Sequence, residues 1–212
     1  MRFATRKFVT LLVLSASVGA GLSACAPIVM GGAVVGSMMA TDRRTTGAQV
    51  EDEGIELRAA SRIRDNLGER VHINITSYNR QVLLTGEVPS AQDKQLAEQV
   101  VARVENVRAI VNELAILGNT SLTQRSSDAL VTGRVKANLV DARDLFANAF
   151  KVVTERGTTY LLGRVTQREA NRATDIARST GGVQKVVRLL EIISEEELAN
   201  LLPKPAPADA KK

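Results

Sequence analysis

The chain has 212 residues, of which 44% are hydrophobic but only six are aromatic, and its formal net charge is +5. Three of the cations, Arg2, Arg6 and Lys7, lie at the N-terminus, so that residues 25–212 have a net charge of only +2. This small charge, without a basic patch that contains interleaved aromatic residues, argues against nucleic acid as a partner.

The first 24 residues have the layout of a cleaved export signal. The N-terminal cations precede an apolar run from Phe8 to Leu14, and small residues lead to Leu22-Ser23-Ala24-Cys25. This tetrapeptide resembles the bacterial lipobox, which implies lipid attachment to the Cys25 sulfur, cleavage before Cys25 and acylation of the new amino group. Three acyl chains would anchor the protein permanently, since each buried methylene contributes about 0.8 kcal/mol.

An uncleaved membrane-spanning anchor is the alternative, because no charged residue lies between Phe8 and Asp42. The many small residues and Pro27 argue against a regular span. Because Cys25 is the only cysteine, no disulfide is expected, although export leads to an oxidising compartment. Gly32 and Gly36 have the spacing of a helix-packing motif, but the small-residue composition favours a flexible, lipidated tether over residues 25–49.

The mature chain contains two copies of one sequence pattern. In the first copy, a first helix is predicted by apolar residues at helical spacing, Ala60, Ile63 and Leu67. A hairpin of two strands is predicted next, with a turn at Asn79-Arg80. Apolar residues lie at alternating positions in each strand: Val71, Ile73 and Ile75 in the first, and Val82, Leu84 and Val88 in the second. Ser90 caps a second helix whose apolar face contains Ala97, Val100, Val101 and Val104. A last strand runs from about Arg108 to Ile116.

The second copy repeats this order, with its hairpin turn at Arg156-Gly157. Ile63 matches Val135, Gly86 matches Gly163, and Val107 to Ile116 matches Val183 to Ile192, at spacings of 72, 77 and 76 residues. The sequence therefore predicts an α+β fold made of two tandem αββαβ modules. Modules of about 60 residues are marginally stable alone, so we expect the two copies to pack on each other.

The domain organisation follows from these segments. We expect a signal peptide at 1–24, the tether at 25–49, a first module at 50–117 and a second module at 126–193. Gly118 to Arg125 is typical of a polar linker. Ser194 and the acidic residues after it predict a short helix at 194–202, and the Pro- and Ala-rich end, 203–212, should be disordered.

Helix-hairpin-helix-strand units that have a central glycine, Gly86 and Gly163, and are repeated twice after a lipobox resemble BON domains. The whole chain is similar to the dual-BON outer-membrane lipoproteins, with further likeness at residues 40–50 and 152–157. The resemblance implies a periplasm-facing lipoprotein of the outer membrane. It also implies that the second module binds anionic phospholipid and that the protein supports envelope integrity and cell division. Neither Ala26 nor Pro27 is an aspartate, which by analogy with the family is consistent with sorting to the outer membrane.

The charge distribution also favours the second module as the lipid-binding one. Residues 50–116 contain 8 Lys/Arg and 11 Asp/Glu, whereas residues 126–192 contain 11 Lys/Arg and 7 Asp/Glu. The second copy also has extra residues between its first helix and first strand, including an apolar pair. We therefore expect a lipid-facing edge formed by Leu130, Arg134, Lys136, Leu145 and Phe146. Two alternatives remain, namely that Leu130 and Phe146 pack against the first module, or that the modules are a lipid-tethered adaptor for an envelope protein.

Catalysis is not expected. The chain has one histidine, His72, and its one cysteine is assigned to the lipid, so that no nucleophile, base or metal set can be assembled. His72 falls in an alternating strand and is expected to be an ordinary strand residue. No metal-ligand spacing and no phosphate-binding glycine loop is present, so no cofactor is expected.

Overall fold

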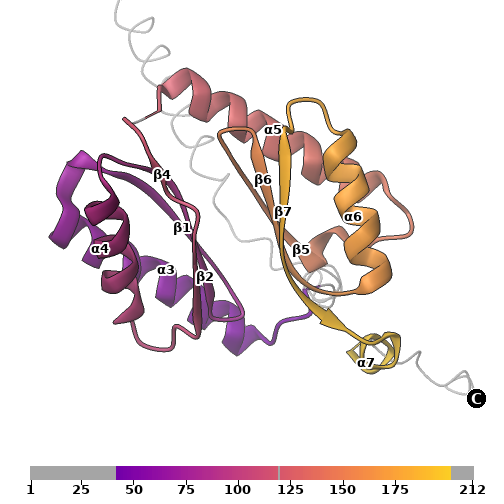
Figure 1. Ribbon diagram of the computed structural model, residues 1–212. Coiled ribbons are helices and arrows are strands. Elements are labelled where there is room, and N and C mark those ends of the chain that lie inside the picture. Colours follow the sequence, from indigo (N-terminus) through magenta and orange to yellow (C-terminus); the bar gives the residue numbers. More distant parts are fainter. Residues whose placement is uncertain (1–41, 119, 202–212) are drawn as a thin grey trace, which may run out of the picture. The chain divides into compact units, whose positions relative to one another are not determined.

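A computed structural model describes residues 42–118 and 120–201 (Figure 1). The first module contains α3 (Thr46–Leu67), η2 (Gly68–Arg70), β1 (His72–Tyr78), β2 (Gln81–Val88), α4 (Ala91–Ala102), β3 (Ala109–Asn112) and β4 (Ala115–Ile116). The second contains α5 (Leu122–Asp141), η3 (Ala147–Ala149), β5 (Phe150–Glu155), β6 (Thr158–Thr166), α6 (Gln167–Ser179), β7 (Lys185–Ile193) and α7 (Glu195–Leu201). The predicted α+β class and the αββαβ order are confirmed in both copies. The signal peptide, Cys25 and the tail at 203–212 lie outside the described residues.

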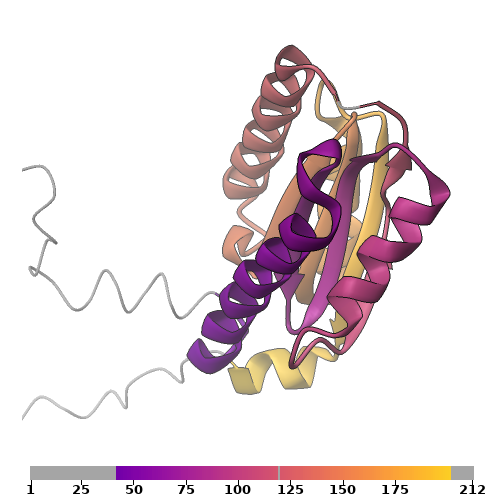
Figure 2. The same ribbon diagram turned by 90° about the vertical axis from the view of Figure 1, so that its left-hand side faces the viewer.

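Each module builds one mixed sheet around a central strand. In the first, β2 pairs antiparallel with β1 and parallel with both β3 and β4. In the second, β6 pairs antiparallel with β5 and parallel with β7 along the whole of β7. The parallel connections pass through α4 and α6, as a parallel pair requires a crossover. Figure 1 shows that the two long helices of each module lie on one side of its own sheet, and in Figure 2 α3 and α4 lie in front of the first sheet.

Both hairpin turns are held by a buried aspartate of the preceding helix. Asn79 and Arg80 have positive φ angles of 49° and 66°, and their backbone N–H groups each donate to the Asp52 carboxylate at 2.8 Å. The second turn repeats this arrangement with Arg156, Gly157 and Asp128. Turns with two left-handed residues match the twist of the strands that they join. Both predicted turns are therefore confirmed.

These aspartates also correct the predicted alignment of the two copies. Asp52 and Asp128 are 76 residues apart, and the same offset matches the buried Ile63 with Leu139 rather than with Val135. The predicted offset of 72 was one helical turn out, because apolar residues recur every turn and either register looks similar in the sequence. With offsets of 76 in the helix and 77 in the hairpin, the second module is one residue longer between these two points. Residues 142–149 separate α5 from β5, whereas only residues 68–71 separate α3 from β1, so the extra residues predicted between the first helix and the first strand are confirmed.

A glycine in each central strand allows a close backbone approach. A Cβ atom built on Gly86 would lie 2.1 Å from the carbonyl oxygen of His72, and one on Gly163 would lie 2.5 Å from that of Ala149. Gly86 also has a φ angle of 111°, which side chains rarely allow. Both glycines are therefore positions where a neighbouring backbone segment approaches closely.

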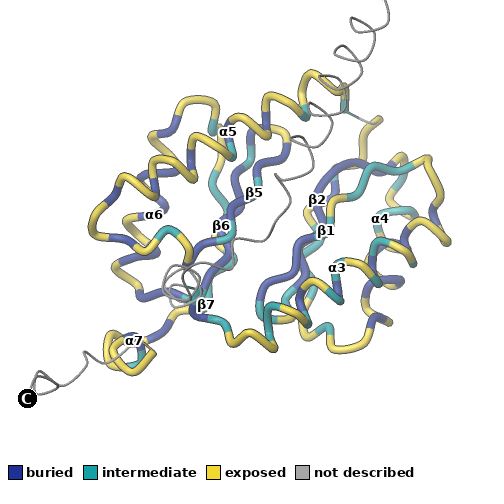
Figure 3. The backbone as a smooth tube through the Cα atoms, turned by 180° about the vertical axis from the view of Figure 1, so that it is seen from behind, coloured by how far each residue is buried: buried dark blue, intermediate teal, exposed yellow. Residues whose placement is uncertain are grey.

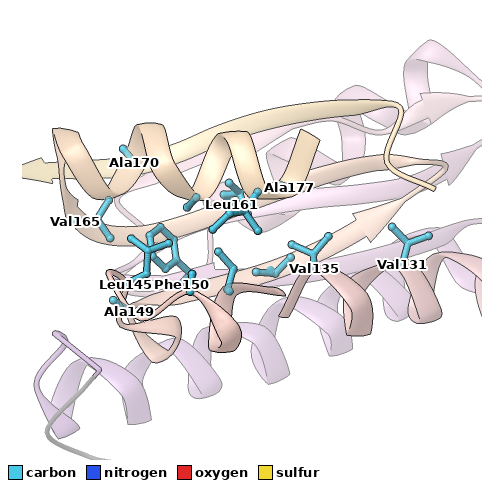
Figure 4. Close-up of a cluster of buried hydrophobic side chains, with 14 residues drawn as sticks. Val131, Val135, Leu145, Ala149, Phe150, Leu161, Val165, Ala170 and Ala177 are labelled. Atoms are coloured by element: carbon cyan, nitrogen blue, oxygen red, sulfur yellow. The ribbon is translucent and has the colours of Figure 1, made fainter. Parts of the chain in front are cut away.

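Each sheet and its helices enclose a separate aliphatic core. In the first module, α3 buries Ile55, Ala59, Ile63 and Leu67, so that Ala59 rather than the expected Ala60 belongs to the core. The predicted apolar face of α4 is confirmed, since Ala97, Val100, Val101 and Val104 are all buried. The second core, drawn in Figure 4, contains Phe150 together with residues of α5, β6 and α6.

A third buried cluster joins the two modules within the compact unit Met38–Lys212. It contains Tyr78, Leu83, Tyr160 and Leu162, which come from the sheet faces that the helices leave uncovered. Polar contacts surround it: the Lys151 ammonium lies 2.6 Å from Glu56, and the backbone N–H of Arg164 donates to the Tyr78 hydroxyl at 3.2 Å. The expectation that the two copies pack on each other is confirmed.

The structure corrects the end of the predicted tether. Helix α3 begins at Thr46, and the side chain of its N-cap, Thr45, accepts from the N–H of Ala48. Before it, the buried Arg43 guanidinium donates two hydrogen bonds of 2.7 Å to the Glu169 carboxylate of α6. Residues 42–49 therefore belong to the folded unit. The sequence could not reveal this, because the residue that Arg43 contacts is 126 residues away.

The other two boundary predictions have different outcomes. The predicted short C-terminal helix is observed as α7, where the N–H of Glu197 donates to the Ser194 hydroxyl at 3.0 Å. The predicted linker was too long at its C-terminal end, since Ser121 already caps α5. Polar residues such as Gln124 and Arg125 form the first turn of that helix instead.

Candidate functional site

Helix α5 has one buried side and one uncharged exposed side. Val131, Val135 and Leu139 lie in the core, whereas Leu130 and Val140 are 63% and 69% exposed. At 100° per residue, Leu122 projects in the same direction as Val140, Gly133 and Ala137 lie close to that direction, and Leu122 is 78% exposed. Figure 3 shows exposed residues along this outer side. We call the set of Leu122, Leu130, Gly133, Ala137 and Val140 the outer strip.

Cations border the outer strip on both sides. Arg134 lies about 40° from Leu130 on one side, and Lys136 lies about 40° from Val140 on the other. Both are exposed, and Arg134 donates to the neutral carbonyl of Gly181 at 3.3 Å, which leaves its charge uncompensated. Asp141, the last residue of the helix, projects within about 20° of the direction of Leu130, so a carboxylate also lies on the Arg134 side. The exposed side of α5 therefore combines apolar residues with cations along its two borders.

Three other cations of the second module form ion pairs with carboxylates. Arg164, Arg168 and Arg172 pair with Glu191, Glu195 and Asp144, at 3.4, 3.6 and 3.1 Å. Among the ion pairs of residues 42–118 and 120–201, none involves Arg134, Lys136 or Arg143. The same is true of the exposed cations of α6 and β7, which are Arg178, Lys185 and Arg188. The unpaired positive charge of the second module therefore lies on α5 and just after it, and also on α6 and β7.

The structure divides the five residues of the predicted lipid-facing edge. Leu130, Arg134 and Lys136 are exposed on α5. Leu145 is only 9% exposed and belongs to the core of the second module, so its assignment to the edge was wrong. Its position in the connection between α5 and β5 suggested a surface loop. In the structure, the Leu145 side chain packs into the core instead.

Phe146, the fifth residue of the predicted edge, is partly exposed to solvent. The residue is 42% exposed, and the Arg43 guanidinium carbon lies 5.9 Å from the ring centroid. Arg43 precedes the predicted first module, so this contact is not the packing against the first module that the alternative described. Sequence reasoning missed Leu122 and Val140, although their spacing of 18 residues, five helical turns, is a signal that could have found them.

Within the described parts of the chain, no helix combines the length and the apolar character that a membrane crossing requires.

Comparison with known proteins places these features in a family. The BON domain model matches residues 52–118 and 127–194. "Outer membrane lipoprotein DolP" of Haemophilus influenzae is 38% identical over 175 residues, which cover 81% of this chain and 90% of that protein. "21 kDa hemolysin" of Actinobacillus pleuropneumoniae is 32% identical over 72% of this chain and 79% of its own length.

A solved structure of CdsD, a structural protein of the type III secretion system of Chlamydia trachomatis, covers 69% of this chain at 14% identity. Its TM-score of 0.28 is too low to relate the two arrangements. The family match and the DolP relative do not depend on it. Together with the two αββαβ modules, they show that this chain belongs to the BON domain family and contains two copies of the domain.

Proposed function

We propose that this chain is an outer-membrane lipoprotein that faces the periplasm and binds anionic phospholipid through the outer strip of α5 and its bordering cations. It uses this binding to support the integrity of the envelope, and it performs no catalysis. The observation that carries the proposal is the pairing of exposed apolar residues on α5 with cations that have no carboxylate partner. The name of the 38% identical relative supports the location.

The physical roles differ along the helix. Leu122, Leu130 and Val140 enter the boundary between headgroups and acyl chains, where burial of a large aliphatic side chain is worth about 1.5–3 kcal/mol. Arg134 and Lys136 meet the anionic headgroups, each contributing about 1 kcal/mol near the surface. Because the acyl chains on Cys25 already hold the protein on the membrane, this binding orients the modules and selects lipid.

Vesicle co-sedimentation of residues 38–212, which lack the anchor, tests the proposal. We expect binding to phosphatidylglycerol vesicles to exceed binding to phosphatidylcholine vesicles and to fall with added salt. The double variant Leu130→Asp/Val140→Asp should lose at least tenfold in affinity. Leu57→Asp is the matched control, because Leu57 is 74% exposed on α3, the corresponding helix of the first module. Equal loss in the control, or equal binding to both vesicles, would contradict the proposal.

The adaptor alternative has a distinct outcome in the same system. Arg134→Glu with Lys136→Glu should remove vesicle binding if lipid is the ligand. Unchanged vesicle binding together with loss of a crosslinked envelope protein would favour the adaptor. Intact mass and N-terminal mapping of the membrane-extracted protein test the anchor, since an unmodified Cys25 still preceded by Met1 to Ala24 would identify a signal-anchored protein instead.

A further inference from the structure

Three residues that are far apart in the sequence meet at one corner of the contact between the modules. They are His72 of β1, Glu87 of β2 and Glu155 of β5, and one potential ligand atom from each lies within 4.8 Å of the others. The Nδ1 atom of His72 is 2.9 Å from the Oε2 atom of Glu87. The Glu87 side chain is fully buried, and Glu155 is 7% exposed.

One carboxylate oxygen at this corner has no hydrogen-bond partner. The Oε1 atom of Glu87 is buried and accepts no hydrogen bond, although the Nη1 atom of Arg156 lies 3.7 Å away. The Arg156 side chain is 41% exposed, so much of its charge is solvated. A buried carboxylate oxygen without a donor is a candidate ligand for a cation.

The corner is accessible from solvent and contains oriented ligands. A surface pocket of about 220 Å³ is lined by His72, Asn74, Arg125, Asp128 and Glu155, among others, whereas Glu87 is not part of its lining. The Asn74 side-chain amide donates to the Oε2 atom of Glu155 at 2.7 Å, and the backbone N–H of Thr120 donates to the Oε2 atom of Glu87 at 3.2 Å. Hydrogen bonds of this kind hold metal-binding carboxylates in position.

The corresponding corner of the repeat is built differently. At the hairpin offset of 77 residues, Ala149 replaces His72, Arg164 replaces Glu87, and Tyr78 is the counterpart of Glu155. There the Tyr78 hydroxyl accepts from the backbone N–H of Arg164 at 3.2 Å, so a neutral phenol fills the place. The fold therefore does not require a histidine and two carboxylates at this position.

We propose that His72, Glu87 and Glu155 bind a divalent transition-metal ion, of which Zn²⁺ is the best fit, and thereby join the two modules. Zn²⁺ commonly takes three protein ligands from histidine and carboxylate plus a water, with bonds of about 2.0–2.2 Å. Tetrahedral ligands are then about 3.4 Å apart, so binding needs only a small separation of His72 from Glu87 and an inward shift of Glu155. This site goes beyond the proposed lipid binding, which uses α5.

Titration of the full chain with Zn²⁺ against a chromogenic chelator tests the site. The protein is purified in detergent without a polyhistidine tag and treated with EDTA, and residues 38–212 serve as a second sample that lacks Cys25. We expect one equivalent of Zn²⁺ to bind in both, and Mg²⁺ not to compete, because magnesium prefers oxygen ligands. His72→Ala and Glu155→Gln should each weaken binding at least tenfold. Asn74→Ala should weaken it about tenfold, because Asn74 orients Glu155.

Glu56→Gln is the matched control, because Glu56 joins the modules through Lys151 but lies outside the three-residue cluster; its affinity for Zn²⁺ should stay within about twofold. The chain has one histidine, so the ring nitrogen signals of ¹⁵N-labelled His72 report the site without ambiguity and should shift on addition of one equivalent. Circular dichroism verifies that each variant is folded. Unchanged His72 signals, or equal Zn²⁺ affinity in folded His72→Ala, would overturn the proposal.

Discussion

Replacement of Arg43 by Ala should strongly destabilise the unit that contains both modules. The side chains of Arg43 and Glu169 are 3% and 1% exposed, and two hydrogen bonds of 2.7 Å join them. Arg43 also donates to the carbonyl of Arg164 at 3.0 Å. Removal of one partner leaves a buried, uncompensated carboxylate, which typically costs about 3–5 kcal/mol. In a unit of this size, each kcal/mol shifts Tm by about 2–4 °C, so Tm should fall by roughly 6–20 °C.

Thermal and urea unfolding of residues 38–212 measure this loss, and Arg172→Ala is the control. Arg172 pairs with Asp144 at 3.1 Å, but both side chains are about half exposed, so the loss should stay below about 1 kcal/mol. The double variant Arg43→Met/Glu169→Met should recover part of the stability, because no charge is then left buried. A loss in Arg43→Ala no greater than in Arg172→Ala would refute the reasoning.

The pH dependence provides a second check on the same pair. Burial alone would raise the pKa of Glu169, but the hydrogen bonds from Arg43 and from the N–H of Thr166 outweigh it and lower that pKa. A lowered folded-state pKa means that the stabilisation is present above the unfolded value of about 4.3 and is lost as the pH falls through the folded-state value. The difference in stability between the wild type and Arg43→Ala should therefore shrink on acidification below about pH 4.

Three further changes have defined outcomes. Gly86→Ala should lower the free energy of unfolding in urea by more than about 2 kcal/mol, because its Cβ would lie 2.1 Å from the His72 carbonyl oxygen. Gly133→Ala is the control and should be neutral or slightly stabilising, because a Cβ there meets no atom within 4 Å. Equal losses in the two variants would argue against the close approach at Gly86. Asp52→Ala should destabilise by about 2 kcal/mol or more, because it deprives the N–H groups of Asn79 and Arg80 of their acceptor. Burial raises the pKa of Asp52, but its hydrogen bonds from Ser77, Arg80 and Arg44 lower that pKa overall. The stabilisation by Asp52 should therefore be present above about pH 4 and disappear at lower pH. A stability loss in Asp52→Ala that is independent of pH would contradict this. Leu139→Ala should lower the free energy of unfolding by about 2–5 kcal/mol, because Leu139 is 1% exposed. Leu130→Ala should lower it by less than about 0.5 kcal/mol and yet weaken vesicle binding. A large stability loss for Leu130→Ala would mean that its exposed position is wrong.

The lipid-binding prediction shows how far periodicity alone could lead. Charge counts and the spacing of apolar residues identified the exposed Leu130, Arg134 and Lys136 on the first helix of the second module. The same reasoning assigned Leu145 to the surface, although it lies in the core. Apolar residues in a loop look the same in the sequence whether they point inward or outward, since no helical or strand period there defines a face.

Features that depend on neighbouring residues were determined by the sequence. The cap at Ser90 arises from a hydrogen bond within three residues, and the buried face of α4 follows from apolar residues at helical spacing. The positions of the hairpin turns follow from the breaks between the alternating strands, although the Asp52 and Asp128 carboxylates that hold these turns lie 27–29 residues away. The repeated pattern added the αββαβ order and the expectation that the copies pack together, because each small module alone leaves an apolar sheet face uncovered.

Only the tertiary structure determined which distant residues meet. Arg43 and Glu169 are 126 residues apart, and Glu155 is 68 residues from Glu87, so no local period relates them. Their contacts depend on how one sheet lies against the other, and a buried charge is tolerated only where that packing supplies a partner. For the same reason His72 reads in the sequence as an ordinary strand residue, while in the folded chain it lies beside two carboxylates.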